Sequence, residues 1–323
     1  MIAMFSHTIA LPKQGKRSLS GGGARSLRRL YPLYLMMIPG LAYLLINNYF
    51  PIIGLVLSFQ KINYADGIFR GAWVGLENFE YLFATKDAWI ITRNTVGYNL
   101  AFIVLSVVMG VSTAIMLNEI RSKFFSRAFQ TMLLMPYLIS WLLVAFLLYG
   151  FLGTQSGVLN RLLMRFGMNK ISWYNTPKYW PFIICFVTCW RNTGYSCILY
   201  LSSIVGIDPA YYESASLDGA SKWQQIRLIT LPLLRPTISF LVLLSIGSMF
   251  YSDFGLFYRV PMDSGILYPV TNTIDTYVYR ALLVKNNLNM STAASCYQSV
   301  VGFLLLLISN GIVRRIDRDN AIF

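Results

Sequence analysis

The segment Val96–Leu117 has the sequence VGYNLAFIVLSVVMGVSTAIML and contains no charged residue. A helix of about twenty mainly apolar residues is long enough to cross the hydrocarbon core of a bilayer, so this segment predicts a transmembrane helix. Five other segments are similarly apolar: Tyr31–Phe59, Thr131–Leu152, Pro181–Val205, Ile238–Tyr258 and Thr292–Val313. The sequence therefore predicts an all-α membrane protein with about six transmembrane helices.

The composition of the whole chain supports this class. Hydrophobic residues make up 56% of the 323 residues and charged residues only 12%, whereas a soluble domain carries about 25% charged residues. The net charge of +14 could indicate nucleic-acid binding. Basic residues that flank apolar segments also set the orientation of a membrane protein, however. The second interpretation fits the pattern better, and we expect no nucleic-acid partner.

Basic residues concentrate in three segments next to the predicted spans. They are Lys13, Lys16, Arg17, Arg25, Arg28 and Arg29 before the first span, Arg121, Lys123 and Arg127 after the second, and Arg314, Arg315 and Arg318 after the sixth. An excess of Lys and Arg marks the cytoplasmic side, so both termini are predicted to be cytoplasmic. We expect residues 1–30 to form a flexible basic arm, which could contact lipid headgroups, and residues 31–323 to form the transmembrane domain.

The sequence offers few residues from which a catalytic or metal site could be built. Its cysteines, Cys185, Cys189, Cys197 and Cys296, lie inside apolar segments, and its one histidine, His7, lies in the polar tail. Zinc and redox sites need several such ligands close together. We therefore predict no metal site and no catalytic residue.

The connection between the fourth and fifth predicted spans, residues 208–236, has strong helix-capping signals. Asp208 is suited to the N-cap of a first short helix. Gly219 is suited to the left-handed residue that ends this helix. Ser221 and Gln224 have the spacing of a capping box for a second helix. The segment therefore predicts two short helices joined at a glycine.

The second of these helices is predicted to carry a narrow apolar face. Trp223, Ile226 and Ile229 follow one another at three-residue spacing, and Pro232 is predicted to end the helix. Such a helix can lie on lipid or in a groove of a partner protein. Because the face is short and carries few basic residues, we interpret it as a docking site for a partner.

The same connection resembles a motif of known transporters. It is similar to the EAA loop of permeases in binding-protein-dependent ABC importers at Glu213, Ala215, Asp218, Gly219, Ala220, Ile229, Leu231 and Pro232. In that family, too, the loop precedes the penultimate span. Ser214 departs from the family pattern by replacing an alanine, and Ile226 stands where sugar permeases often have phenylalanine.

A second resemblance covers the C-terminal part of the chain. Its segments are 253–258 (DFGLFY), 267–271 (LYPVT), 274–281 (IDTYVYRA), 297–302 (YQSVVG) and 315–323 (RIDRDNAIF). They resemble the LplB-type branch of carbohydrate permeases. This branch is similar to the maltose-type permeases and is associated with complex oligosaccharides and polysaccharides, alginate among them.

The resemblance implies a multi-pass subunit of a bacterial inner-membrane importer. Its partners would be a second homologous permease, two ATP-binding subunits, a periplasmic solute-binding protein, the oligosaccharide substrate and the lipid bilayer. The chain would bind no cofactor of its own, because Gly15-Lys16 lacks the upstream glycine of a phosphate-binding loop. ATP and Mg would be held by the partner ATPase.

The resemblance also implies roles for single residues. Glu213 would contact the ATPase, and Gly219 would form the turn between the docking helices. The full set of implied ATPase-coupling residues is Glu213, Ser214, Ala215, Asp218, Gly219, Ala220, Trp223, Ile229, Leu231 and Pro232.

Arg191 and Asp253 lie inside predicted spans, where ionisable residues are costly and often functional. Sugars are held by hydrogen-bonding groups and aromatic faces. The candidate substrate path is therefore Arg191, Asn192, Tyr195, Tyr251, Asp253 and Tyr258. An acidic, alginate-like glycan would favour the arginine. The alternatives are a buried Arg191–Asp253 ion pair and side chains that reach the lipid headgroups.

Two other functions are compatible with a polytopic chain. A membrane-embedded transferase would need a clustered acid and base, and the acids here are scattered. A channel or secondary transporter without an ATPase partner usually has discontinuous spans and internal repeats, and the sequence indicates neither. The capped connection at 208–236 favours the importer subunit.

Overall fold

The computed structural model describes residues 23–62, 67 and 70–316, so most of the predicted basic arm lies outside the described residues. The chain divides into two compact units, residues 1–53 and 54–323. The described part of the first unit is helical. It consists of α1 (Gly23–Leu44), the π turn η1 (Leu45–Tyr49) and α2 (Phe50–Ile53).

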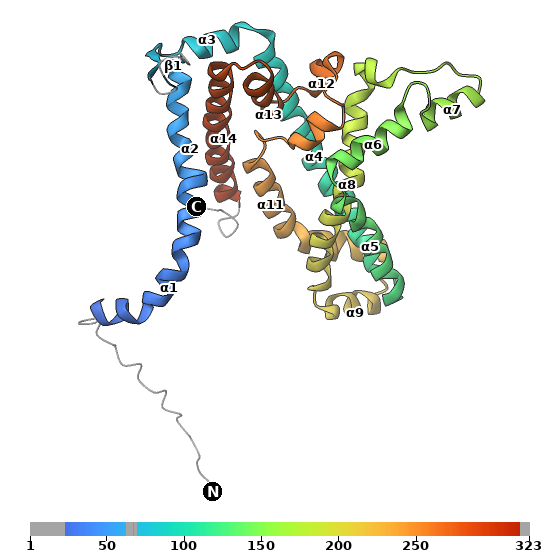
Figure 1. Cartoon of the computed structure of the whole chain (residues 1–323). Helices are drawn as coiled ribbons and strands as arrows, with labels where there is room; N and C mark the ends of the chain where they lie inside the picture. Colours follow the sequence, from blue (N-terminus) through green and yellow to red (C-terminus); the bar gives the residue numbers. More distant parts are fainter. Residues whose placement is uncertain (1–22, 63–66, 68–69, 317–323) are drawn as a thin grey trace. The chain divides into compact units, whose positions relative to one another are not determined.

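The second unit contains the other elements, which Figure 1 colours along the chain. Its first half comprises η2 (Gly54–Phe59), the antiparallel pair β1 (Gln60–Lys61) and β2 (Ala72–Trp73), α3 (Glu77–Ala84), α4 (Lys86–Asn118), α5 (Lys123–Leu138), α6 (Trp141–Leu152), α7 (Val158–Arg165), η4 (Trp173–Asn175), η5 (Pro177–Tyr179) and α8 (Trp180–Val205). Its second half comprises α9 (Pro209–Leu217), α10 (Lys222–Gln225), η6 (Ile226–Thr230), α11 (Leu231–Gly247), η7 (Gly255–Arg259), η8 (Gly265–Leu267), α12 (Tyr268–Thr271), α13 (Ile274–Tyr279), η9 (Arg280–Val284) and α14 (Leu288–Ile316).

Five helical segments of the described residues are long and apolar enough to cross a membrane. They are Leu30–Phe59, Lys86–Asn118, Pro177–Val205, Lys222–Gly247 and Leu288–Gly311. The pair α5 and α6 is a sixth if its two arms form one span. The prediction of an all-α membrane protein with about six transmembrane helices is confirmed.

The core of the second unit forms where α8 packs against α4 and α5. Trp180, Ile184 and Tyr200 of α8 are fully buried. Close approach of the helices depends on small residues. A β-carbon at Gly194 of α8, for example, would overlap the carbonyl oxygen of Leu133 in α5. These three helices form the scaffold on which the candidate site is built.

The helix α4 connects the two ends of the second unit. Its 33 residues give it a length of about 50 Å. Figure 1 shows α3, α12 and α13 at one end of this unit and α9 at the other. At the second end, the Lys222 ammonium lies 3.2 Å from the carboxylate of Glu119, the residue after α4.

The predicted third span, Thr131–Leu152, is not one continuous helix. The structure has two helices, α5 and α6, which meet at a bend of 96°. Ile139 is extended between them, with ψ at 132°. Ser140 begins α6 as its N-cap and accepts a hydrogen bond from the Leu143 N–H at 3.4 Å. This local serine–backbone bond competes with helix continuation, although the hydrophobic pattern runs on without change.

The predicted fifth span, Ile238–Tyr258, is wrong at both ends. The helical segment runs from Lys222 to Gly247. Pro232 does not end it, because the π turn η6 comes directly before: the Leu231 N–H bonds to the carbonyl of Ile226, five residues back. This wider turn accommodates the missing N–H of proline within a continuing helix.

Candidate functional site

The connection 208–236 contains α9 and α10, and both helices begin with the caps that the sequence predicts. The Asp208 carboxylate accepts a hydrogen bond from the Ala210 N–H at 2.9 Å. Ser221 and Gln224 form a capping box, in which the Gln224 side chain accepts from the Ser221 N–H at 2.7 Å. The free backbone groups at the helix starts are thus satisfied within the connection itself.

Gly219 forms the turn between α9 and α10. Its φ of +78° lies in the left-handed region, where a β-carbon is sterically disfavoured. Its N–H bonds to the carbonyl of Ser216 at 3.1 Å, and the Ala220 N–H bonds to that of Ala215 at 2.9 Å. These two bonds are the Schellman arrangement that ends a helix. A glycine is therefore favoured here by conformation.

Two side-chain contacts hold α9 against α10 and against the η6 turn that follows it. The Gln225 amide donates to Ser216 Oγ at 2.9 Å, and Gln225 is only 5% exposed. The hydroxyls of Tyr212 and Thr230 lie 2.9 Å apart. The helix pair is thus held by its own bonds, and α10 continues into α11 through η6.

The residues of the predicted apolar stripe on the second helix differ in their exposure. Trp223 is 68% exposed, whereas Ile226 and Ile229 are half-buried. Leu217 and Leu228, which the sequence pattern does not single out, are 90% and 69% exposed. Among the other implied coupling residues, Glu213, Ser214, Asp218 and Gly219 are exposed, and Ala215, Ala220, Leu231 and Pro232 are half-buried. The pair therefore presents large apolar side chains to its surroundings.

Residues 248–253 interrupt the helical chain after α11, and side chains from other helices bond to their backbone. Asn99 of α4 donates to the carbonyl of Tyr251 at 3.1 Å. Gln298 of α14 donates to the carbonyl of Phe250 at 2.8 Å. Irregular backbone in a membrane protein is tolerated where such partners replace the helical bonds. The interruption is therefore fixed by α4 and α14, and it is a discontinuity that the sequence did not indicate.

Asp275 of α13 also holds this interruption in place. One of its carboxylate oxygens accepts hydrogen bonds from the N–H and the hydroxyl of Ser252, each at 2.7 Å. The other oxygen accepts from the Gln298 amide at 3.1 Å. A single carboxylate thus joins the segment after α11 to α13 and α14.

Arg191 of α8 lies at the bend between α5 and α6. Its Nε donates to the carbonyl of Ile139 at 3.3 Å, a backbone group that the bend leaves without a helical partner. Its guanidinium carbon lies 4.3 Å from the ring centre of Trp141 and 5.2 Å from that of Tyr137. Cation–π contacts of this kind stabilise a charge inside a helix bundle.

Asp253 is connected to Arg191 through Trp141. The indole N–H of Trp141 donates to one carboxylate oxygen of Asp253 at 2.6 Å. The other oxygen accepts from the N–H groups of Gly255 and Leu256 at 2.9 and 3.3 Å, and so caps the next helical turn. Within the described part of the chain, the ion pair considered for Arg191 and Asp253 is not formed. Each charge instead stabilises a break in the helices.

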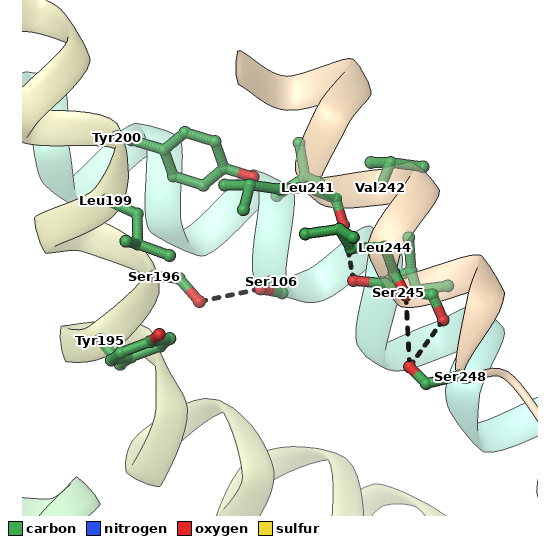
Figure 2. Close-up of a pocket in the computed structure, with 12 residues that line it drawn as sticks. Ser106, Tyr195, Ser196, Leu199, Tyr200, Leu241, Val242, Leu244, Ser245 and Ser248 are labelled. Carbon is green, nitrogen blue, oxygen red and sulfur yellow. Dashed lines mark hydrogen bonds between the residues drawn. The ribbon is translucent and has the colours of Figure 1, made fainter. Parts of the chain in front are cut away.

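Figure 2 shows a groove of about 290 Å³ between α4, α8 and α11. Its hydroxyl-bearing lining residues are Ser106, Tyr195, Ser196, Tyr200, Ser245 and Ser248. The hydroxyls of Ser106 and Ser196 lie 2.9 Å apart, between α4 and α8. Tyr195 connects this serine groove to the Arg191 cluster, because its ring stacks on Tyr137 at 4.9 Å. Hydroxyl groups inside an apolar bundle suit a ligand rich in hydroxyls.

The structure brings together only part of the predicted substrate path. Arg191, Asp253 and Tyr195 meet through Tyr137 and Trp141, and Asn192 Oδ1 accepts from Arg191 Nη1 at 3.4 Å. Tyr251 is an exposed residue of the interruption, and Tyr258 lies in another cluster. Tyr137, Trp141 and the serines are not predicted from the sequence. Polar residues three apart in an apolar segment, as at Ser245 and Ser248, were the available signal for the serines.

Tyr258 borders a second cationic cluster, which is built around Arg280. Arg280 is 6% exposed, its Nε donates to the Asp263 carboxylate at 2.7 Å, and its Nη1 donates to Asn272 Oδ1 at 2.6 Å. The guanidinium carbon also lies 4.1 Å from the ring centre of Tyr268. Burial raises the pKa of Tyr268, although the nearby Arg280 opposes this shift.

Comparison with known proteins finds relatives over most of the chain. Residues 106–319 match the family model described as binding-protein-dependent transport system inner membrane component. The protein LplB of Bacillus subtilis is 31% identical over 294 residues, which cover 91% of this chain and 92% of LplB. The polygalacturonan/rhamnogalacturonan transport system permease protein YteP of the same organism is 31% identical over 287 residues, which cover 89% of each chain.

Two solved structures have the same fold. One is a bacterial ABC transporter involved in the import of the acidic polysaccharide alginate, with a TM-score of 0.83 at 31% identity, covering 91% of this chain and 99% of that chain. The other is a bacterial alginate ABC transporter in complex with an alginate pentasaccharide-bound periplasmic protein. Its TM-score is 0.82 at 30% identity, covering 92% of this chain and 98% of that chain.

Proposed function

Because the chain belongs to the family of binding-protein-dependent transport system inner membrane components, we propose that it is the permease subunit through which an ATP-driven importer moves oligosaccharides or polysaccharides into the cytoplasm. The names of YteP and of the alginate transporters support an acidic glycan as the substrate. The observation that carries the proposal is the α9–α10 pair. Its helices are capped and bonded to each other, yet Leu217 and Trp223 of the pair, and Leu228 of the adjoining η6, remain exposed.

The partner of this exposed surface is proposed to be an ATP-binding subunit. Large apolar side chains on a polar connection favour burial by another protein. Glu213 and Asp218 are exposed on the same pair and would attract basic residues of that subunit. The importer would contain two such subunits, which would bind ATP and Mg, and a second homologous permease would complete the pore.

This assignment would also orient the chain in the membrane. α9 would face the cytoplasm, and so would both termini and the basic arm at residues 1–30. The opposite end of α4, where α3, α12 and α13 lie, would face the periplasm and the solute-binding protein. Residues 31–323 would then form the transmembrane domain, with the coupling connection at 208–236.

The continuity of α10, η6 and α11 supports a mechanical route from the ATPase to the groove. A displacement of the docked pair would pass along α11 to Ser245 and Ser248, which line the serine groove. It would also reach the interruption after Gly247 and, through Asp253 and Trp141, the bend between α5 and α6. Nucleotide-driven closure would thus change the groove by moving whole helices about these two breaks.

We assign the glycan path to the serine groove together with the Arg191 cluster. The serine hydroxyls and Tyr195 would exchange hydrogen bonds with the hydroxyls of the sugar. The guanidinium of Arg191, which contacts aromatic rings and forms no ion pair among the described residues, would attract the carboxylates of a uronate chain.

The test is purification of the tagged chain from its native membranes, with identification of the bound chains and an ATPase assay. We expect a second permease, an ATP-binding subunit, and ATP hydrolysis stimulated by glycan-loaded binding protein. A Trp223→Asp variant should lose the ATP-binding subunit and keep the second permease. Isolation of the chain alone, without ATPase at any detergent strength, would favour a stand-alone transporter or channel.

A further inference from the structure

A second polar pocket, of about 310 Å³, lies where the start of α4 meets α12, α13 and η9. Its ionisable and amide side chains are Asp87, Tyr268, Asn272, Tyr277, Arg280 and Lys285. Among the described residues, it shares no lining residue with the serine groove. It lies at the end of the second unit opposite α9 and is a separate candidate site.

Arg280 leaves one donor of this pocket unused. Its Nε and Nη1 are bonded to Asp263 and Asn272, but its buried Nη2 has no hydrogen-bond partner among the described residues. Buried polar groups in native proteins are nearly always paired, so an unpaired one requires an explanation. A ligand oxygen would supply the missing acceptor. A carboxylate is the group that a guanidinium binds most strongly.

A loop that is distant in sequence but contacts Arg280 holds this guanidinium in one orientation. Met262 and Asp263 have φ values of 54° and 49°, in the left-handed region that residues with a β-carbon rarely adopt. The Asp263 carboxylate so placed accepts from Arg280 Nε and from the Tyr268 hydroxyl at 3.1 Å. Strained backbone of this kind persists where the surroundings fix it, often at binding sites.

The other lining groups suit a sugar ring. The Asp87 carboxylate can accept from sugar hydroxyls, and Lys285 is an exposed donor. In the described part of the chain neither forms an ion pair. Burial and the nearby Asp87 raise the pKa of Tyr277 to about 12, so its hydroxyl stays protonated. The pocket volume of about 310 Å³ is at the lower end of small-molecule sites, as one sugar unit requires.

We infer that this pocket is an outer glycan subsite, which binds one uronate unit with its carboxylate at Arg280 Nη2 and Lys285 and its hydroxyls at Asp87. The inference rests on the proposed function, which supplies the glycan and places this end of the chain in the periplasm. A carboxylate side chain of the binding protein is the competing ligand. Both ligands would place a carboxylate at Arg280, but only a uronate also has hydroxyls that can donate hydrogen bonds to Asp87.

The test measures glycan binding to the complete importer in lipid nanodiscs, without binding protein or ATP. The probes are a uronic acid trimer and its carboxyl-reduced, neutral counterpart. Lys285→Gln should weaken binding of the uronate trimer about tenfold and leave binding of the reduced trimer unchanged. Asp87→Asn should weaken binding of both. The matched control is Lys86→Gln, which removes an exposed charge next to Asp87 that does not line the pocket.

Equal affinities in wild type, Lys285→Gln and Asp87→Asn would overturn the subsite, whereas import by the wild-type complex would show that the proposed function still holds. If the wild-type complex shows neither glycan import nor ATP hydrolysis, the proposed function itself is wrong. A third result would also overturn the subsite. In it, the Lys285→Gln variant binds the trimer as the wild type does, but needs a higher concentration of binding protein to stimulate its ATPase activity. The pocket would then bind a protein carboxylate. Rim variants are used because Arg280 also holds the surrounding loop.

Discussion

The connection at 208–236 and the interruption at 248–253 both depart from regular membrane helix, but they are stabilised in opposite ways. In the connection, partners close in sequence satisfy the helix ends, as Ser221 and Gln224 do. In the interruption, the partners are Asn99 of α4 and Gln298 of α14. A locally bonded unit can move as one piece, whereas a segment bonded to several helices must respond when those helices move.

This difference assigns separate tasks to the two ends of α11. Its start is continuous with α10, so in the proposed mechanism it would receive a displacement of the helix pair. Its end leads into the interruption, where Asp275 and Asp253 connect the chain to α13 and to the bend between α5 and α6. Variants at the two ends should therefore fail differently: those in the connection in coupling, and those in the interruption in assembly or in passage of the glycan.

The largest effect is expected from Asp275→Ala. The substitution leaves the N–H and hydroxyl of Ser252 without this acceptor and also removes a partner of Gln298. Loss of partners for such partly buried groups costs about 3 kcal/mol. Thermal unfolding of the purified permease should have a lower midpoint temperature. Purification should also give a poor yield of the assembled complex. Asp275→Asn keeps an acceptor oxygen, so its midpoint temperature should fall less. An unchanged midpoint for the alanine variant would contradict this account of the interruption.

Gly219→Val should act on coupling rather than on assembly. A β-branched residue at a φ of +78° strains the turn between α9 and α10, by about 1–2 kcal/mol. We expect normal membrane insertion and a loss of glycan uptake and of stimulated ATP hydrolysis. Gly219→Asn is the matched control, because asparagine tolerates the left-handed region. Normal uptake by the valine variant would count strongly against a docking role for the pair.

Asp253→Asn is expected to change transport by a few fold and to leave assembly intact. The amide oxygen can still cap Gly255 or accept from Trp141. The loss of a negative charge near Arg191 should favour binding of an acidic glycan, since like charges no longer repel. Uptake of a uronate oligosaccharide and of its carboxyl-reduced form would measure the difference. If assembly fails instead, Asp253 acts mainly as a structural cap.

The sequence predicted the connection well because its signals are local. The N-cap, capping box and left-handed glycine are defined within a few residues, as at Asp208 and Gly219. Each break contains only a single capping residue, Ser140 or Asp253, and one such residue inside an apolar segment does not by itself predict a break. The carbonyl of Ile139 is satisfied by Arg191, 52 residues away, and that of Tyr251 by Asn99, 152 residues away. Apolar residues flank both breaks, and their stabilising partners come from distant parts of the sequence, so the folded chain is needed to locate them.

The candidate path was predicted in part for the same reason. Arg191 and Asp253 were predicted because ionisable residues inside spans are often functional. The same reasoning does not apply to Trp141, which is uncharged and lies between them. The predicted span Ile238–Tyr258 puts Tyr258 on one helix with Asp253. The interruption instead directs Tyr258 to Arg280, where its ring lies 5.5 Å from the guanidinium carbon.

The smallest effect is expected from Lys222→Ala. Lys222 forms the ion pair between the connection and Glu119 beyond the end of α4, but both side chains are exposed, at 72% and 42%. Such a pair contributes less than about 0.5 kcal/mol, so the melting midpoint should not change measurably.

If the connection is held by its own hydrogen bonds, Lys222→Ala and Glu119→Gln should both keep uptake. Loss of uptake in Lys222→Ala alone would place Lys222 in contact with the ATPase. Equal losses in both variants would mean that α4 helps to hold the connection, and local capping would no longer explain its rigidity.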